Sequence, residues 1–149
     1  MVNVIMHGCN GKMGRVITDL ISKDEDVQIV AGIDAYTGIA NDYPVFKSIK
    51  ECDVKADAII DFAVTAAIDD LLDYAVETKT PVVVCTTGLS AQQLDKVNEA
   101  SKSVAVNTIL KDGILGNNCL CHGNLGNTEI LFEYLKDHTR KNKRDKKEI

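Results

Sequence analysis

A glycine-rich turn near the N-terminus constrains the fold of this chain more than any other feature. Residues 8–14 read GCNGKMG, which has the spacing G-x-x-G-x-x-G. The turn follows an apolar run over residues 2–6. It precedes apolar residues that recur at the spacing of one helical face, namely Met13, Val16, Ile17, Leu20 and Ile21. The pattern predicts a strand, a tight turn and a helix, which is the first unit of a fold built on parallel strands.

The alternation of strand-like and helix-like segments continues over the first hundred residues. Runs rich in β-branched residues at positions 27–33, 58–62 and 81–87 each predict a strand, and residues 104–106 offer a further, shorter one. A Ser90-x-x-Gln93 capping box predicts the start of the last helix. The spacing of buried helical faces recurs at Ile68, Leu71, Leu72, Ala75 and Val76 and at Leu94, Val97 and Ala100. The expected class is α/β, a Rossmann-type doubly wound parallel sheet forming a single domain with an atypical C-terminal segment.

Composition narrows the class of protein. The 149 residues match the length of about one domain, and 45% hydrophobic with 26% charged residues argues against a disordered, fibrous or membrane-spanning chain. Aromatic residues make up 5%, tryptophan is absent and the net charge is -5, so no nucleic-acid partner is expected. No run approaches the ~20 apolar residues of a transmembrane helix, and five cysteines fit reduced thiols. We expect a cytoplasmic protein without membrane contact.

The C-terminal part differs in character from the rest. Residues 107–127 contain four Gly and five Asn without a period, residues 130–135 have the spacing of one short helix, and residues 138–149 hold six Lys/Arg against two acids. We expect a domain over residues 1–106, a Gly/Asn-rich segment over 107–127, and a short helix with a basic tail over 128–149. The tail is interpreted as a solvated terminus, with an RNA, membrane or other anionic contact as the minority alternative.

A glycine turn that opens a helix can hold a pyrophosphate, because the helix N-terminus presents unpaired amides and a positive dipole end. Gly8 would permit the tight turn, Gly11 the close approach of a phosphate, and Gly14 the close packing of helix on strand. Lys12 would add a positive charge. The alternative is that the glycines only shape a βα turn.

Asp34 stands twenty residues after Gly14, at the end of the second expected strand. An acidic side chain there accepts hydrogen bonds from the adenosine ribose, which indicates a nicotinamide dinucleotide. The next residue is Ala35 and not Arg, so NADH should be accepted at least as well as NADPH, although Lys12 weakens that preference. The alternative is that Asp34 only caps a strand end.

Polar and small residues also follow the third and fourth expected strands. Asp61 and Phe62 end one of them, and Thr86, Thr87 and Gly88 follow the other. The carboxyl ends of parallel strands meet at the edge where ligands bind in open α/β sheets, so these residues would line one crevice. Each group taken alone is more often a plain turn.

The histidines and the cysteine cluster carry no assigned chemistry. His7 is interpreted as a strand-end side chain and His138 as a solvated one, and neither is expected in a catalytic pair. The cluster Cys119-Leu120-Cys121-His122 lacks a second group to complete a tetrahedral zinc site. No metal site and no catalytic residue are assigned.

The segments VIMHGCNGKMG at 4–14, IIDF at 59–62 and VVVCTTGLS at 82–90, with the strand end at Asp34, resemble the dihydrodipicolinate reductase family over residues 1–106. The resemblance implies an NADH- or NADPH-dependent reductase of a cyclic dicarboxylate in lysine and diaminopimelate biosynthesis. It implies that the pyrophosphate loop is formed by Gly8, Asn10, Gly11, Lys12, Met13 and Gly14. It also implies that Asp34 binds the ribose, that Phe62 lies on the nicotinamide side, and that Thr86, Thr87 and Gly88 lie where nicotinamide meets substrate.

The resemblance ends after residue 106. The family continues into a second domain that binds substrate and forms a tetramer, with a His-His pair, a lysine and a Pro-Ser-Gly-Thr loop. This sequence has no His-His pair and no Pro-Ser-Gly-Thr. We therefore expect a truncated form that binds nucleotide, lacks the catalytic domain, does not form the family tetramer and is inactive by itself. The alternatives are a non-catalytic NAD(P)-binding or regulatory module and an unproductive gene fragment.

Overall fold

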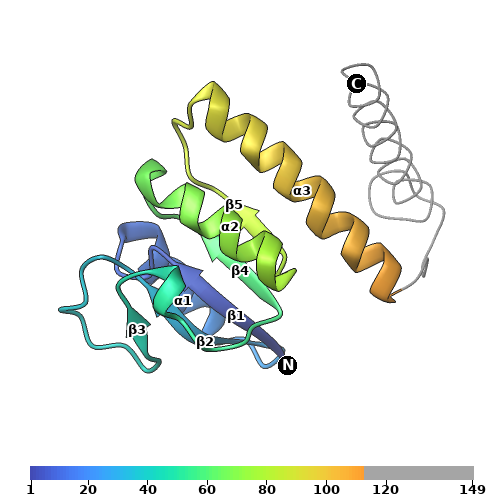
Figure 1. Cartoon of the computed structure of the whole chain (residues 1–149). Coiled ribbons are helices and arrows are strands. Elements are labelled where there is room, and N and C mark those ends of the chain that lie inside the picture. Colours follow the sequence, from blue (N-terminus) through green and yellow to red (C-terminus); the bar gives the residue numbers. More distant parts are fainter. Residues whose placement is uncertain (113–149) are drawn as a thin grey trace, which may run out of the picture. The chain divides into compact units, whose positions relative to one another are not determined.

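The computed structural model describes the backbone of residues 1–112. Within them five strands form one sheet in the order β3-β2-β1-β4-β5, and all neighbouring pairs are parallel (Figure 1). The strands are β1 (Val2–His7), β2 (Val27–Ile33), β3 (Val45–Phe46), β4 (Ala58–Asp61) and β5 (Val82–Val84). The four strands expected from the apolar runs are confirmed to within a few residues. The short β3 is not predicted, because two residues are too few to show a periodic pattern.

Three α-helices and two 3-10 turns accompany the described strands, and the last helix follows the last strand. The helices are α1 (Lys12–Ile21), α2 (Ile68–Thr78) and α3 (Ala91–Asp112), and the turns are η1 (Ile49–Glu51) and η2 (Thr65–Ala67). The capping box that starts α3 is confirmed: Ser90 Oγ accepts the Gln93 amide at 3.2 Å, and Gln93 Oε1 accepts the Ser90 amide at 3.0 Å. The helix therefore begins where two otherwise unpaired amides find side-chain acceptors.

The largest buried cluster lies between α2 and the sheet. Leu71 and Leu72 of α2 pack in one cluster with Ile5 of β1 and Ile59 of β4. Ile5 and Ile59 are register partners in adjacent parallel strands, so their side chains point to the same face. Figure 1 shows α2 crossing this part of the sheet. The buried helical face predicted from the apolar spacing is confirmed, and each such side chain contributes about 1.5–3 kcal/mol of hydrophobic free energy.

The apolar stripe of α1 is more exposed to solvent than the buried face of α2. The chain runs from β1 to β2 in one direction across the sheet and from β4 to β5 in the other, so right-handed crossovers place α1 and α2 on opposite faces. Met13 and Val16 are each 45% exposed and Leu20 is 63% exposed. Helical spacing predicts which side chains share a face, but it does not predict how fully that face is covered.

Residues 104–106 are helical, so the expectation of a strand there is wrong. Residues 104–106, Val-Ala-Val, continue α3, whose N-terminus is capped at Ser90, and the first glycine after Ala91 is Gly113. With no breaker in between, the helix extends through them. The expected helix at 130–135, the basic tail, Cys119–His122 and His138 lie outside the described residues. Among the described helices, none is both long and apolar enough to cross a membrane.

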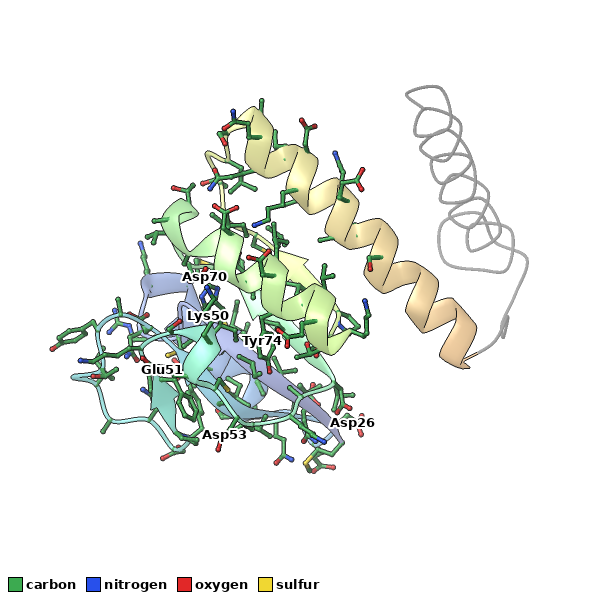
Figure 2. The ribbon with its side chains drawn as sticks, in the orientation of Figure 1. Asp26, Lys50, Glu51, Asp53, Asp70 and Tyr74 are labelled. Atoms are coloured by element: carbon green, nitrogen blue, oxygen red, sulfur yellow. The ribbon has the colours of Figure 1, made fainter. Side chains whose placement is uncertain are left out.

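Ion pairs connect α2 to its two neighbours. Lys50 Nζ of η1 lies 2.7 Å from Asp70 Oδ1, and Figure 2 shows the two side chains next to each other. On the other side, Lys96 Nζ lies 3.1 Å from Asp69 Oδ1 and 3.0 Å from Asp73 Oδ1. Because these side chains are largely solvated, the pairs orient α2 more than they stabilise it.

Candidate functional site

The direction of the chain across the sheet reverses at the carboxyl ends of β1 and β4. From β1 the chain continues to β2 and β3 on one side, and it later returns to place β4 and β5 on the other. The connections that leave β1 and β4 therefore diverge above neighbouring strands. Ligands of open α/β folds bind at such a point. The glycine turn leaves β1 here, and Phe62 leaves β4 beside it.

The glycine turn is shaped by close backbone contacts. Gly8 has φ of +82°, and a Cβ added to it would lie 2.7 Å from the carbonyl oxygen of Phe62. A Cβ on Gly14 would overlap the carbonyl oxygen of Gly8 and lie 2.7 Å from Cys9 Cα. Gly11 differs, because its added Cβ would approach only the Gly8 oxygen, at 3.2 Å. Gly8 and Gly14 thus close the turn, and Gly11 leaves an open surface on it.

The N-terminus of α1 opens directly from this turn. Gly11 is the N-cap residue, its backbone is extended, and no side chain caps the helix. The Gly11 amide bonds to the Gly8 oxygen at 3.1 Å, and the first intrahelical bond runs from the Arg15 amide to the Gly11 oxygen at 3.1 Å. The amides of Lys12, Met13 and Gly14 belong to the first turn, which has no acceptor within its own helix. We call these three amides the cradle, since unpaired amides at a helix N-terminus are able to bind an anion.

Asp34 connects the end of β2 to the glycine turn. Its Oδ2 accepts the Asn10 amide at 3.0 Å, and its Oδ1 accepts the Tyr36 amide at 2.9 Å. The Asp34 amide in turn donates to the Phe46 oxygen of β3 at 3.0 Å. Each carboxylate oxygen has a second lone pair beyond these bonds, so Asp34 can still accept a ligand hydroxyl. The structure thus brings Asp34 and the turn together, as the spacing predicts.

Asn10 and Asn41 extend this connection into the loop after β2. The Asn10 side chain donates to the Tyr36 carbonyl oxygen at 2.5 Å, and its own oxygen accepts from Asn41 at 3.0 Å. Sequence reasoning missed Tyr36 and Asn41, because the residues between 35 and 44 have no periodicity that would indicate which of them return to the turn. The network holds the loop against the glycine turn.

The thiol of Cys9 is enclosed beneath the same turn. Cys9 is fully buried, and its Sγ lies only 2.7 Å from where a Cβ on Gly32 would be. Burial, and after it the nearby Asp34 carboxylate, raises the pKa of the thiol to about 11. A buried, protonated thiol is unreactive, so Cys9 is part of the packing of the turn.

The other candidate segments at this end of the sheet follow β4 and β5. The Phe62 amide donates to the His7 oxygen at 2.9 Å, which keeps the half-buried Phe62 beside the start of the glycine turn. Thr87 and Gly88 are exposed. Gly88 has φ of +78°, and a Cβ added to it would meet no atom within 4 Å, so this glycine is required for backbone conformation and not for space.

His7 and Asp61 form a buried pair that the sequence did not predict. His7 ends β1 as expected, but its Nδ1 lies 2.7 Å from Asp61 Oδ1, with His7 3% and Asp61 0% exposed. Asp61 therefore does not line an open crevice, and that expectation is wrong. The signal was present in the register, because both residues end adjacent parallel strands. Among the described residues, no group of three or more His, Cys, Asp or Glu side chains could hold a metal ion.

Comparisons with known proteins identify the family that this chain matches. Residues 2–110 match the family described as "Dihydrodipicolinate reductase, N-terminus". The 4-hydroxy-tetrahydrodipicolinate reductase of Clostridium novyi is 48% identical over 106 residues, which are 71% of this chain and 42% of that protein. The enzyme of the same name from Methanospirillum hungatei is 31% identical over 146 residues, 95% of this chain and 53% of its own. The chain thus spans about half or less of the length of these relatives.

Solved structures share the fold. The dipicolinate-bound dihydrodipicolinate reductase of Paenisporosarcina sp. TG-14 matches with a TM-score of 0.62 and 19% identity, over 70% of this chain and 44% of that one. The myo-inositol 2-dehydrogenase of Lactobacillus plantarum matches with a TM-score of 0.59 and 19% identity, over 70% and 34%. The Rossmann-type fold is confirmed. Because residues 2–110 match the N-terminal part of the dihydrodipicolinate reductase family, the chain belongs to that family.

Proposed function

We propose that this chain is the nucleotide-binding part of an NAD(P)H-dependent 4-hydroxy-tetrahydrodipicolinate reductase, which serves lysine and diaminopimelate biosynthesis. The observation that carries the proposal is the uncapped N-terminus of α1, which opens from the glycine turn with Asp34 hydrogen-bonded to that turn at 3.0 Å. An anion cradle and a carboxylate held side by side match the two polar parts of an adenosine dinucleotide.

The pyrophosphate would lie on the cradle. The amides of Lys12, Met13 and Gly14 would donate to it, and the open surface at Gly11 would let it approach the backbone. Gly8 and Asn10 keep the turn in this shape, Gly8 through its positive φ and Asn10 through its bond to the Tyr36 oxygen. The cradle lacks any internal acceptor for its amides, so the residues present fit a pyrophosphate.

Asp34 would accept the hydroxyl groups of the adenosine ribose. Residues 35–44 contain no Lys or Arg to pair with a 2′-phosphate, so we expect NADH to bind at least as tightly as NADPH. Lys12 lies at the exposed start of α1. Its positive charge would attract a 2′-phosphate and so reduce the difference between the affinities for NADH and NADPH.

The nicotinamide would lie toward Phe62 and the loop of Thr86, Thr87 and Gly88. When bound, the reduced nicotinamide supplies a hydride from its C4 to an electron-poor ring carbon of a cyclic dicarboxylate. The side chains of this chain bind and orient the nucleotide for that transfer. Protonation of the product and recognition of the substrate carboxylates require groups that we do not assign to residues 1–112.

Calorimetric titration with NADH, NADPH and ADP-ribose tests the nucleotide site. We expect Asp34→Ala to weaken binding of all three, because all three carry the adenosine ribose. Asp57→Ala is the matched control, since the Asp57 carboxylate also accepts a backbone amide, that of Asn3 at 2.8 Å, but at the opposite edge of the sheet. An Asp34→Ala affinity equal to that of the control would remove Asp34 from the site, and a wild-type chain that binds none of the ligands would refute the proposal.

A turnover assay with the same polypeptide separates binding from chemistry. We expect the 149-residue polypeptide, assayed alone, to bind NADH and to reduce the dicarboxylate at a negligible rate, because general acid-base catalysis is worth about 10²–10⁴-fold and substrate orientation adds to it. Turnover at a rate similar to that of a full-length relative would overturn this expectation. Binding without turnover also fits the alternative of a non-catalytic nucleotide-binding module.

A further inference from the structure

Three side chains from three segments of the chain meet at the carboxyl edge of the sheet. His7 ends β1, Asp61 ends β4, and Thr86 follows β5. Asp61 Oδ1 lies 2.7 Å from His7 Nδ1, and Asp61 Oδ2 accepts the Thr86 hydroxyl at 2.7 Å. We call these residues the His7-Asp61-Thr86 network. Its two bonds join residues that are 54 and 25 positions apart in the sequence.

The network has a defined direction of hydrogen bonding. Burial by itself raises the pKa of Asp61, but hydrogen bonds from His7, Thr86 and the Ala63 amide outweigh burial and hold the pKa below its usual range. Asp61 is therefore a carboxylate at neutral pH and can only accept hydrogen bonds. It follows that His7 carries a proton on Nδ1 and that the Thr86 hydroxyl points its hydrogen toward Asp61. Both carboxylate oxygens are engaged, so the carboxylate is held in one orientation.

Thr86 is the last point at which the loop after β5 is hydrogen-bonded to the sheet edge. The backbone amide of Cys85 donates to the backbone carbonyl oxygen of Asp61 at 2.9 Å, and this bond ends the ladder between β5 and β4. The Thr86 hydroxyl follows, bonded to Asp61 and, at 3.1 Å, near the Ala63 oxygen. In the described part of the chain no hydrogen bond holds residues 87–89, Leu89 packs against the buried hydrophobic cluster, and the next hydrogen bonds are those of the capping box at Ser90. Thr86 thus fixes the start of the short segment that contains Thr87 and Gly88, and Leu89 fixes its end.

The opposite end of the network lies at the base of the glycine turn. His7 directly precedes Gly8, and its carbonyl oxygen accepts the Phe62 amide at 2.9 Å. The network therefore connects the segment that forms the anion cradle to the segment that follows β5.

We propose that His7 and Asp61 are positioning residues for the nicotinamide end of the nucleotide, which they act on by holding Thr86 and, through it, the loop of residues 86–88. The inference rests on the proposed function, because only a dinucleotide gives this loop a nicotinamide to contact. His7 and Asp61 are buried and do not themselves touch the nucleotide. Loss of the network should therefore affect the nicotinamide half of the ligand and leave the adenosine half unchanged.

Two ligands separate these halves, since ADP-ribose carries everything in NADH except the nicotinamide. We would measure the dissociation constants of both for the full 149-residue chain and for Thr86→Val, which removes the hydroxyl with little change in shape. We expect NADH to bind about tenfold more weakly to Thr86→Val and ADP-ribose to change by less than about twofold. Thr86→Ser, which restores the hydroxyl, should recover most of the NADH affinity.

Variants of His7 test the more distant end of the network. The amide nitrogen of Asn occupies about the place of His Nδ1, so His7→Asn should keep the bond to Asp61 and retain NADH affinity. His7→Leu should weaken the binding of NADH to a similar extent as Thr86→Val does. Thr80→Val is the matched control, because Thr80 is a buried threonine bonded to the Thr78 hydroxyl at 2.8 Å just before β5. If His7→Leu fails to fold, Asp61→Asn takes its place, because the single carbonyl oxygen of Asn can accept only one of the two side-chain hydrogen bonds that the carboxylate accepts from His7 and Thr86.

The outcomes distinguish this inference from the proposed function. A wild-type chain that binds neither ligand refutes the proposed function. A wild-type chain that binds both, with the ratio of the two affinities unchanged in Thr86→Val, refutes the positioning role alone. An equal loss of both ligands in Thr86→Val, or the same selective loss in Thr80→Val, also refutes it. Selective loss of NADH affinity, recovered by Thr86→Ser, supports it, and a matching change in the fluorescence of bound NADH would place the effect at the nicotinamide.

Discussion

The two turns at the carboxyl edge of the sheet are held in shape by different forces. The glycine turn after β1 is determined by its own backbone, since Gly8 and Gly14 approach neighbouring backbone atoms too closely for any side chain. The loop after β5 has open space around Gly88 and is held by the Thr86 hydroxyl on the buried Asp61 carboxylate. Of two neighbouring turns, one can thus be determined by local sterics, while the other depends on a side chain that is distant in the sequence.

Gly14→Ala should have the largest effect, because its Cβ would overlap backbone atoms of Gly8 and Cys9 that cannot move without opening the turn. We expect a loss of more than about 3 kcal/mol in the free energy of unfolding, measured by urea denaturation. Gly88→Ala is the matched control, since its Cβ meets nothing and only the positive φ is unfavourable, at a cost of about 1 kcal/mol. Equal losses in the two variants would contradict the proposed difference between the turns.

Asp61→Ala should have the next largest effect. It leaves the buried Nδ1 proton of His7 without its acceptor and leaves the part-buried Thr86 hydroxyl with only the Ala63 oxygen, at 3.1 Å, and an unsatisfied buried group costs about 1–3 kcal/mol. We expect a loss of about 2–4 kcal/mol in unfolding free energy, with less protection of the amides around residues 85–88 from hydrogen exchange than of those in α1. Equal loss of protection in both turns would show that the network supports the whole sheet edge.

Acid should weaken the same connection. The folded pKa of Asp61 lies below its usual range because the hydrogen bonds from His7, Thr86 and Ala63 outweigh the effect of burial. A group of this kind adds stability that is complete above its unfolded pKa, about 3.9, and is lost as the pH falls through its folded pKa. The difference in unfolding free energy between wild type and Asp61→Asn should therefore shrink as the pH is lowered from about 5 through the unfolded pKa and then through the lower folded pKa of Asp61. A constant difference would contradict the assignment of a carboxylate.

Alkylation of cysteine gives the smallest perturbation and probes each turn separately. Cys9 is fully buried with a pKa of about 11, whereas Cys85, beside the second turn, is only half-buried. With iodoacetamide at pH 8 and peptide mass spectrometry, Cys9 should react at least about a hundredfold more slowly in the native chain than in urea. Protection of Cys85 should be much weaker. Native Cys9 reacting as fast as in urea would show that the glycine turn opens readily.

The regular elements were predictable because their signals are local. The β-branched runs marked β1, β2, β4 and β5, and Ser90 with Gln93 marked the start of α3. The prediction failed at residues 104–106, where β-branched residues continue a helix that is already nucleated. It also did not show that Leu20, on the apolar stripe of α1, would be 63% exposed, since coverage depends on what packs from elsewhere in the chain.

The glycine turn and the place of Asp34 follow from the sequence alone, because the conformational freedom of glycine and the spacing of a βαβ unit are properties of neighbouring residues. Which polar side chains meet is a property of the folded chain. The sequence predicts that Asp61 and Thr86 lie at the same edge of the sheet, but the bonds among His7, Asp61 and Thr86 form only because three parallel strands end there in a particular register. Burial there makes a hydrogen-bonded pair of residues that would be solvated in an isolated strand. The glycine turn that presents the cradle is therefore determined by the local sequence, while the hydrogen bonds that support the loop after β5 exist only in the folded sheet.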